Sequence, residues 1–137
     1  MEIPPGTKIA EKMVFIGLSG CIQCIYLVPL MEFAKKNNLA KEIIVEIMKS
    51  KNDYEQRVSE LGKILGIEID TSIPVPFLYI EIGDMSKVTQ QEIIEEAVTG
   101  IRQELNETDQ FDYLDNEFTN PKQLLNYLTK IVTDTVF

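Results

Sequence analysis

Two cysteines stand where an apolar run gives way to a helical pattern, and this arrangement limits the possible folds. Residues 12–18 contain apolar side chains without alternation, which is typical of a strand buried on both faces. Cys21 and Cys24 follow directly, and apolar side chains then recur as far as Asn38 over much of a helical surface. The pattern predicts a strand, a tight turn and a helix, with both thiols at the junction.

Strands and helices continue to alternate along the chain. Residues 43–48 are rich in β-branched side chains, which favour a strand. A second amphipathic helix follows, with Gly66 as its C-cap and an apolar stripe of Tyr54, Val58, Leu61, Ile64 and Leu65. A strand, a helix and a strand in this order imply a parallel pair joined by a right-handed crossover. Residues 77–82 form a third predicted strand, which Gly83-Asp84 ends.

The last third of the chain is read mainly as helix. Thr89-Gln90-Gln91-Glu92 has the form of a capping box and predicts a helix over residues 89–105. Residues 110–118 fit either an edge strand or a loop. A final helix is predicted from Asn120-Pro121, because a cap residue followed by a first-turn proline favours a helix start. A chain of 137 residues with 45% hydrophobic side chains fits one globular domain over residues 1–137.

The acidic composition excludes some partners. The formal net charge of −9 argues against nucleic acid, which requires clustered basic residues. The acidic residues concentrate between Glu81 and Glu117, which favours a solvated face. The first residues lack the features of a secretory leader, and no apolar run approaches the roughly 20 residues that span a bilayer. We therefore expect a soluble cytoplasmic protein without membrane contact.

The spacing of the cysteines indicates a chemistry. In a reducing cytoplasm a lone cysteine pair is more often catalytic or metal-binding than structural. Cys21 and Cys24 are close enough to form a disulfide ring, and the positive end of a helix stabilises a thiolate. Zinc needs four Cys or His ligands, whereas the chain has two Cys and no His, so we expect no metal, unless two chains share a cluster. The pattern favours thiol–disulfide exchange; two small buried hydrophobic side chains are the alternative.

Two proline positions make the pattern more specific. Pro29 lies five residues after Cys24, and Ile73-Pro74-Val75-Pro76 leads directly into the third predicted strand. Together with the strand–CxxC–helix unit and the second βα unit, these prolines make residues 12–82 resemble the thioredoxin family. The last helix resembles the family only in its position along the chain. The resemblance implies a thioredoxin-like α/β fold, with a central mixed sheet flanked by helices and an extra helical and acidic insertion before the last helix.

The resemblance also implies a role for each residue of the site. Cys21 would attack a substrate disulfide, and Cys24 would resolve the mixed disulfide. Pro76, rather than Pro74, would be the cis proline because the strand begins immediately after it, and Val75 would offer its backbone to the substrate. The implied partners are protein disulfide substrates and an electron donor, either a thioredoxin-reductase-like protein or glutathione, with no bound cofactor.

The residues around the cysteines depart from the family pattern. Many members carry Trp before the first cysteine and Gly-Pro between the two, whereas this chain has Ser19-Gly20 before them and Ile22-Gln23 between them. The intervening dipeptide tunes the reduction potential. Strongly oxidising members commonly carry His there, and the absence of His from this chain favours a reductase or exchange activity.

A second departure concerns the proton acceptor for Cys24. Thioredoxins bury an Asp on the first strand, and Phe15 occupies that position here. Glu46 interrupts the second predicted strand, and a buried carboxylate would have a raised pKa suited to accepting a proton. We hypothesise that Glu46 lies under the cysteine pair and replaces the missing Asp. The alternative is a carboxylate that reaches solvent or pairs with a lysine.

Two other functions fit parts of the pattern. A glutaredoxin-like protein would take electrons from glutathione, but such sites usually carry Tyr or Phe inside the CxxC and a cationic anchor, and neither is evident. A non-catalytic interaction module would use the acidic third helix and residues 106–118 to dock a partner, with the cysteines vestigial or redox-sensing.

Overall fold

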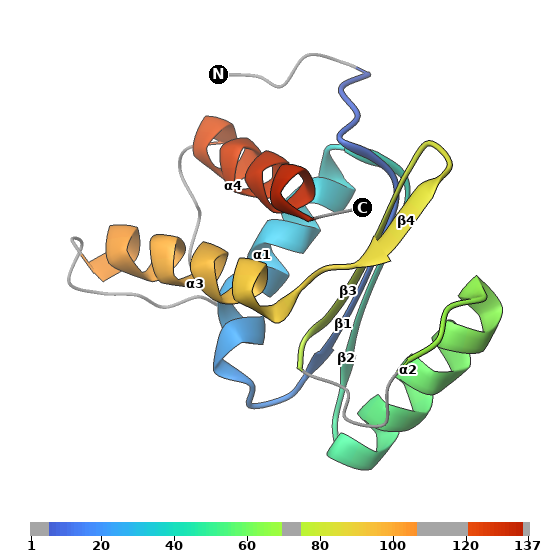
Figure 1. The fold of residues 1–137 in the computed structure, drawn as a ribbon. Coiled ribbons are helices and arrows are strands. Elements are labelled where there is room, and N and C mark those ends of the chain that lie inside the picture. Colours follow the sequence, from blue (N-terminus) through green and yellow to red (C-terminus); the bar gives the residue numbers. More distant parts are fainter. Residues whose placement is uncertain (1–5, 70–74, 107–120, 136–137) are drawn as a thin grey trace.

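A four-stranded sheet forms the centre of the structure, a computed structural model that describes residues 6–69, 75–106 and 121–135 (Figure 1). Its strands are β1 (Ala10–Leu18), β2 (Ala40–Met48), β3 (Phe77–Ile82) and β4 (Met85–Val88). Their order is β2-β1-β3-β4. β1 runs parallel to β2 and antiparallel to β3, and β4 is antiparallel to β3. The mixed sheet, the parallel β1–β2 pair and the three predicted strands are confirmed.

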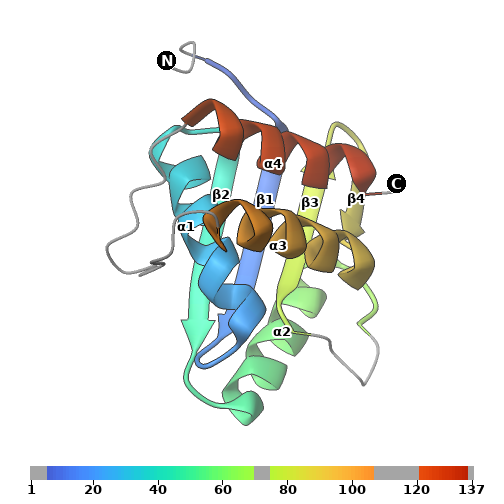
Figure 2. The ribbon, with the colours of Figure 1, turned by 90° about the vertical axis from the view of Figure 1, so that its left-hand side faces the viewer.

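The helices cover the two faces of the sheet unequally. α1 (Ile22–Lys36), α3 (Gln91–Asn106) and α4 (Pro121–Asp134) lie over one face, and α2 (Lys51–Leu65) lies over the other (Figure 2). Gly66 ends α2 in the left-handed conformation with φ 70°, as its sequence position predicted. None of the described helices is long and apolar enough to cross a membrane.

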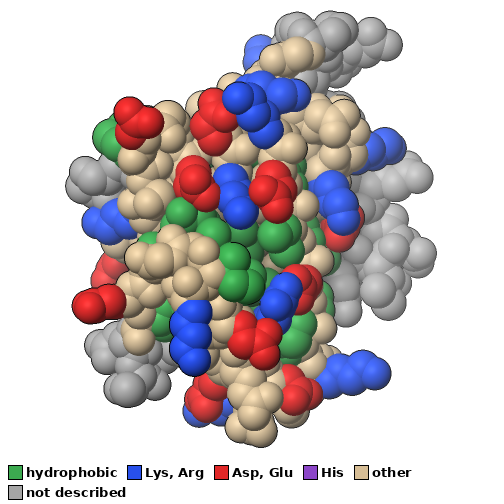
Figure 3. All heavy atoms as spheres, turned by 90° about the vertical axis from the view of Figure 1, so that its right-hand side faces the viewer, with side chains coloured by type: hydrophobic (Ala, Val, Ile, Leu, Met, Phe, Trp, Pro, Cys, Tyr) green, Lys and Arg blue, Asp and Glu red, His purple; other side chains and the backbone are tan. Residues whose placement is uncertain are grey.

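β1 is the strand around which both halves of the core are built. Met13 and Phe15 belong to the core under α1, α3 and α4, whereas Val14 and Ile16 belong to the core under α2. All four side chains are fully buried. Successive side chains of a strand point to opposite faces, so a strand covered on both faces needs an unbroken apolar run. On the α2 face, hydrophobic side chains form a band among acidic and basic ones (Figure 3).

β4 is an element that the sequence reading missed. Ile82 pairs with Met85, so only Gly83 and Asp84 connect the two strands. Gly83 has a φ of 58°, which glycine adopts without the steric penalty of a side chain. A two-residue Gly-Asp connection is a hairpin signal, but the returning strand has only four residues and no buried side chain. The sequence therefore predicts only that a strand ends at Gly83-Asp84, and the structure shows that the two residues connect a hairpin.

The predicted capping box of α3 is wrong. The carbonyl of Gln90 accepts the first helical hydrogen bonds, from the N–H groups of Ile93 and Ile94. Thr89 does not cap the helix: its hydroxyl lies 3.1 Å from the hydroxyl of Thr135, and both side chains are buried. Thr89 therefore ties the end of β4 to the C-terminal end of α4.

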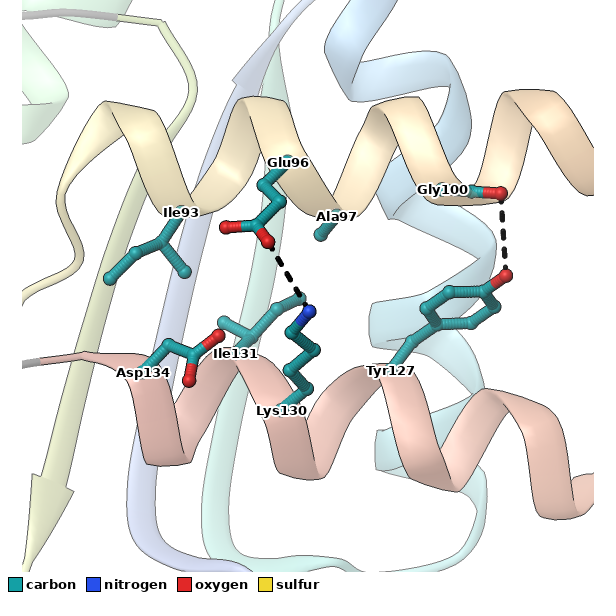
Figure 4. Close-up of a pocket in the computed structure, with 8 residues that line it drawn as sticks. All are labelled: Ile93, Glu96, Ala97, Gly100, Tyr127, Lys130, Ile131 and Asp134. Carbon is teal, nitrogen blue, oxygen red and sulfur yellow. Dashed lines mark hydrogen bonds and ion pairs between the residues drawn. The ribbon is translucent and has the colours of Figure 1, made fainter.

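α4 is also fastened along α3. The Tyr127 hydroxyl donates to the carbonyl of Gly100 at 3.4 Å, and Lys130 pairs with Glu96 at 3.3 Å (Figure 4). These residues border a pocket between the two helices, which is also lined by Ile93, Ala97, Ile131 and Asp134. The exposed ion pair contributes little to stability, so the apolar contacts carry this packing. Residues 110–118, for which the sequence left strand and loop open, lie outside the described residues.

Candidate active site

Cys21 occupies the N-cap of α1. Its backbone is extended, with φ −76° and ψ 121°, and its Sγ accepts a hydrogen bond from the N–H of Cys24 at 3.3 Å. The first N–H groups of a helix have no partner within the helix, so a side-chain acceptor at the N-cap satisfies one of them. Cys21 is half-buried, which leaves it partly accessible to a partner.

Cys24 lies one turn further and is buried, with 3% exposure. The N–H of Leu18 lies 3.5 Å from its Sγ. A Cβ atom at Gly17 would lie 3.2 Å from this sulfur and 2.7 Å from Cδ1 of Ile47, so glycine allows the close approach of β1 to α1. Burial, followed by the hydrogen bond with the Cys21 side chain, raises the pKa of Cys24 to about 12. The two thiols are therefore unequal: one is accessible and the other is buried and protonated.

The Val75–Pro76 peptide bond is cis, at the position for which the sequence favoured it. Pro76 is buried and Val75 is half-buried. Phe77, the next residue, pairs with Ile16 of β1, so this loop enters the sheet at the end where β1 leads into Cys21. The predicted residues Cys21, Cys24, Val75 and Pro76 thus share one end of the sheet. Pro74 lies outside the described residues.

Glu46 is not the buried carboxylate that the sequence analysis placed under the cysteines. Nε and Nη2 of Arg57 in α2 each donate to the carboxylate of Glu46 at 2.8 Å, and 29% of the Glu46 side chain is exposed. The hydrogen bonds from Arg57 lower the pKa of Glu46. Cys24, in contrast, packs in the core on the other face of the sheet. The expectation of a buried carboxylate with a raised pKa is therefore wrong, and the alternative of a basic partner holds, with arginine in place of lysine.

Tyr54 is a buried polar residue whose environment the sequence analysis missed. It is fully buried in the core under α2, where Ile16 and Phe77 also lie. Burial, and then negative charge at Cys24 and Cys21, raises the pKa of Tyr54, so its hydroxyl stays protonated. A neutral phenol does not serve as a base, so Tyr54 does not replace the missing Asp. In the sequence, Tyr54 is recognised only as one member of an apolar helical stripe. The stripe pattern carries no information about where the hydroxyl lies.

Exposed apolar side chains lie next to the thiols. Ile22, between the two cysteines, is 61% exposed, and Ile47, whose Cδ1 lies over Gly17, is 42% exposed. Further along α1, Arg102 of α3 lies over the ring of Tyr26, 5.6 Å from its centre. Apolar surface next to a partly accessible thiol suits contact with a polypeptide better than with a small charged molecule. Among the described residues, no group of three or more Cys, Asp or Glu could hold a metal ion.

Comparison of the chain with models of protein families, with curated proteins and with solved structures found no match.

The inequality of the thiols predicts selective alkylation. Because burial raises the pKa of Cys24 to about 12, this thiol stays protonated at pH 7. Iodoacetamide should therefore label Cys21 in the folded, reduced chain and label Cys24 only after unfolding in guanidinium, as peptide mapping by mass spectrometry can measure. A Cys21→Ser chain should stay nearly unlabelled until it unfolds. Equal labelling of both thiols in the folded chain would contradict the assigned geometry.

The ion pair of Glu46 predicts a pH-dependent contribution to stability. Because the folded pKa of Glu46 lies below its ordinary value of 4.5, the contribution is present above pH 4.5 and is lost as the pH falls through the folded pKa. Glu46→Gln should lower the free energy of unfolding by about 1 kcal/mol at pH 7, with the difference vanishing in acid. Urea unfolding of both chains between pH 7 and acid measures this difference in the free energy of unfolding.

Glu42→Gln is the matched control, because Glu42 lies on the same strand in the more exposed pair with Lys12. Its effect should be smaller. Glu46→Gln should also leave unchanged the rate at which Cys24 attacks a preformed mixed disulfide. A tenfold slower attack would restore Glu46 as a proton acceptor.

Proposed function

We propose that the chain is a thioredoxin-like thiol–disulfide oxidoreductase that reduces disulfides in protein substrates. The observation that carries the proposal is the arrangement of the thiols: Cys21 caps α1 and is partly accessible, while Cys24 is buried one turn away with its N–H on the sulfur of Cys21. A nucleophile at a helix start with a protected second thiol is what two-step disulfide exchange requires. The mixed sheet, with the thiols after β1, supports a thioredoxin-like assignment.

The first step joins the substrate to Cys21. Its thiolate attacks one sulfur of the substrate disulfide, so a Cys21–substrate bond forms as the substrate S–S bond breaks. The second substrate sulfur leaves as a thiolate and takes a proton from water. Cys24 stays out of this step because it is buried and its pKa is about 12.

The second step releases the substrate. Cys24 attacks Sγ of Cys21, the Cys21–Cys24 disulfide forms, and the remaining substrate sulfur leaves and takes the proton of Cys24. In the mixed disulfide Cys21 carries no negative charge, so the part of the raised pKa of Cys24 that came from that charge is removed. Cys24 therefore becomes more acidic at the stage when it must react. The substrate gains two electrons and two protons.

The surroundings of the thiols support a polypeptide substrate. Exposed Ile22 and Ile47 offer apolar contacts to an unfolded or extended polypeptide. Val75, which enters β3 at the same end of the sheet, would add backbone hydrogen bonds in the manner of strand addition. In a reducing compartment such as the cytoplasm, a thioredoxin-reductase-like protein or glutathione would return two electrons to the oxidised chain.

Reduction of insulin by dithiothreitol tests the proposal. The wild-type chain should accelerate insulin precipitation, and Cys21→Ser should lower the rate to that of dithiothreitol alone because the nucleophile is lost. Cys24→Ser should keep the first step and accumulate a mixed disulfide that non-reducing electrophoresis detects. Equal rates for wild type and Cys21→Ser would exclude catalysis. Capture of a partner by both single Cys→Ser variants, without exchange, would favour a non-catalytic module.

A further inference from the structure

The side chain of Gln91 holds the loop that leads into β3. Gln91 is the first residue of α3 and is half-buried. Its Nε2 donates a hydrogen bond to the carbonyl of Pro76 at 3.0 Å. The contact joins the start of one helix to a loop fifteen residues earlier, at the end of the sheet where the thiols lie.

The register of β3 and β4 explains why this contact exists. Tyr79 pairs with Val88, and beyond the end of β4 the N–H of Thr89 still donates to the carbonyl of Leu78 at 2.7 Å. Because the two strands are antiparallel, each residue earlier in β3 lies opposite a residue one position later in the segment that follows β4. The same register therefore places Pro76 opposite Gln91, two positions beyond the pair of Leu78 and Thr89.

Gln91 supplies the hydrogen bond that a longer β4 would donate to the carbonyl of Pro76. Hydrogen-bonded pairs alternate along an antiparallel ladder, so the acceptor that follows the carbonyl of Leu78 is the carbonyl of Pro76. At Gln91, however, the backbone has already turned into α3. The side-chain amide of Gln91 donates in its place. Without it, a carbonyl in a buried residue would lose its partner, which costs free energy.

We infer that Gln91 is a positioning residue for protein substrates, an inference that rests on the proposed function. By fixing the carbonyl of Pro76, it fixes the backbone of Val75, on which an extended substrate would add as a strand. A protein disulfide uses this backbone edge, whereas a small aromatic disulfide reaches Cys21 without it. Loss of Gln91 therefore weakens binding of protein substrates and leaves the thiols intact.

Kinetics of the full chain with two substrates test the role, with dithiothreitol as the reductant for insulin and a single turnover of the pre-reduced chain for the small disulfide. The substrates are insulin and 5,5′-dithiobis(2-nitrobenzoate), a small disulfide. Gln91→Ala removes the donor, and Gln91→Glu keeps the shape but places a carboxylate against a carbonyl. Both should raise KM for insulin about three- to tenfold with little change in kcat, the range expected for one neutral hydrogen bond. The rate with the small disulfide should stay within twofold of wild type.

Gln103→Ala is the matched control, because Gln103 is an exposed glutamine of the same helix. It should leave both substrates unaffected. If the wild type is active and both Gln91 variants have the wild-type KM for insulin, the role of Gln91 is wrong and the proposed function stands. An equal loss with the two substrates also overturns it, because it shows a general structural effect. A wild-type chain inactive with both substrates overturns the proposed function, and this role with it.

Discussion

The hydrogen bond from the N–H of Cys24 to the sulfur of Cys21 is the contact on which the site depends. It makes Cys21 the cap of α1, which places this sulfur among the unpaired donors of a helix start. It also sets the separation of the two thiols, because one helical turn lies between the acceptor and the donor. The accessible sulfur and the buried, protonated one are thus consequences of a single helix start.

The sheet holds this helix start opposite the loop that would receive a substrate. β1 is buried on both faces and lies between β2 and β3, so the turn after Leu18 starts from a central strand. β3 runs antiparallel to β1, which brings its entry loop to the same end. Gln91 then ties that loop to α3. Strand order and register therefore assemble residues that are more than fifty positions apart in the chain.

The sequence predicted the features that depend on local patterns. The buried run of β1, the cysteines at the start of α1 and the C-cap at Gly66 each have short-range signals, and the structure contains them. Features that depend on partners far along the chain were misread or missed. The sequence does not show that α2 brings Arg57 to Glu46. It also does not show that Tyr54 is buried in the core between α2 and the sheet. The donor role of Gln91 follows only from the β3–β4 register, and β4 itself had been overlooked.

The central claim is that Cys21 and Cys24 form one reversible two-electron couple. Equilibration of the chain in glutathione buffers of graded redox ratio, followed by trapping and mass spectrometry, measures this directly. The account predicts a single transition to an internal Cys21–Cys24 disulfide, with a reduction potential below the cytosolic glutathione range of about −220 to −260 mV. Glutathione adducts without an internal disulfide, or a potential well above that range, would contradict it.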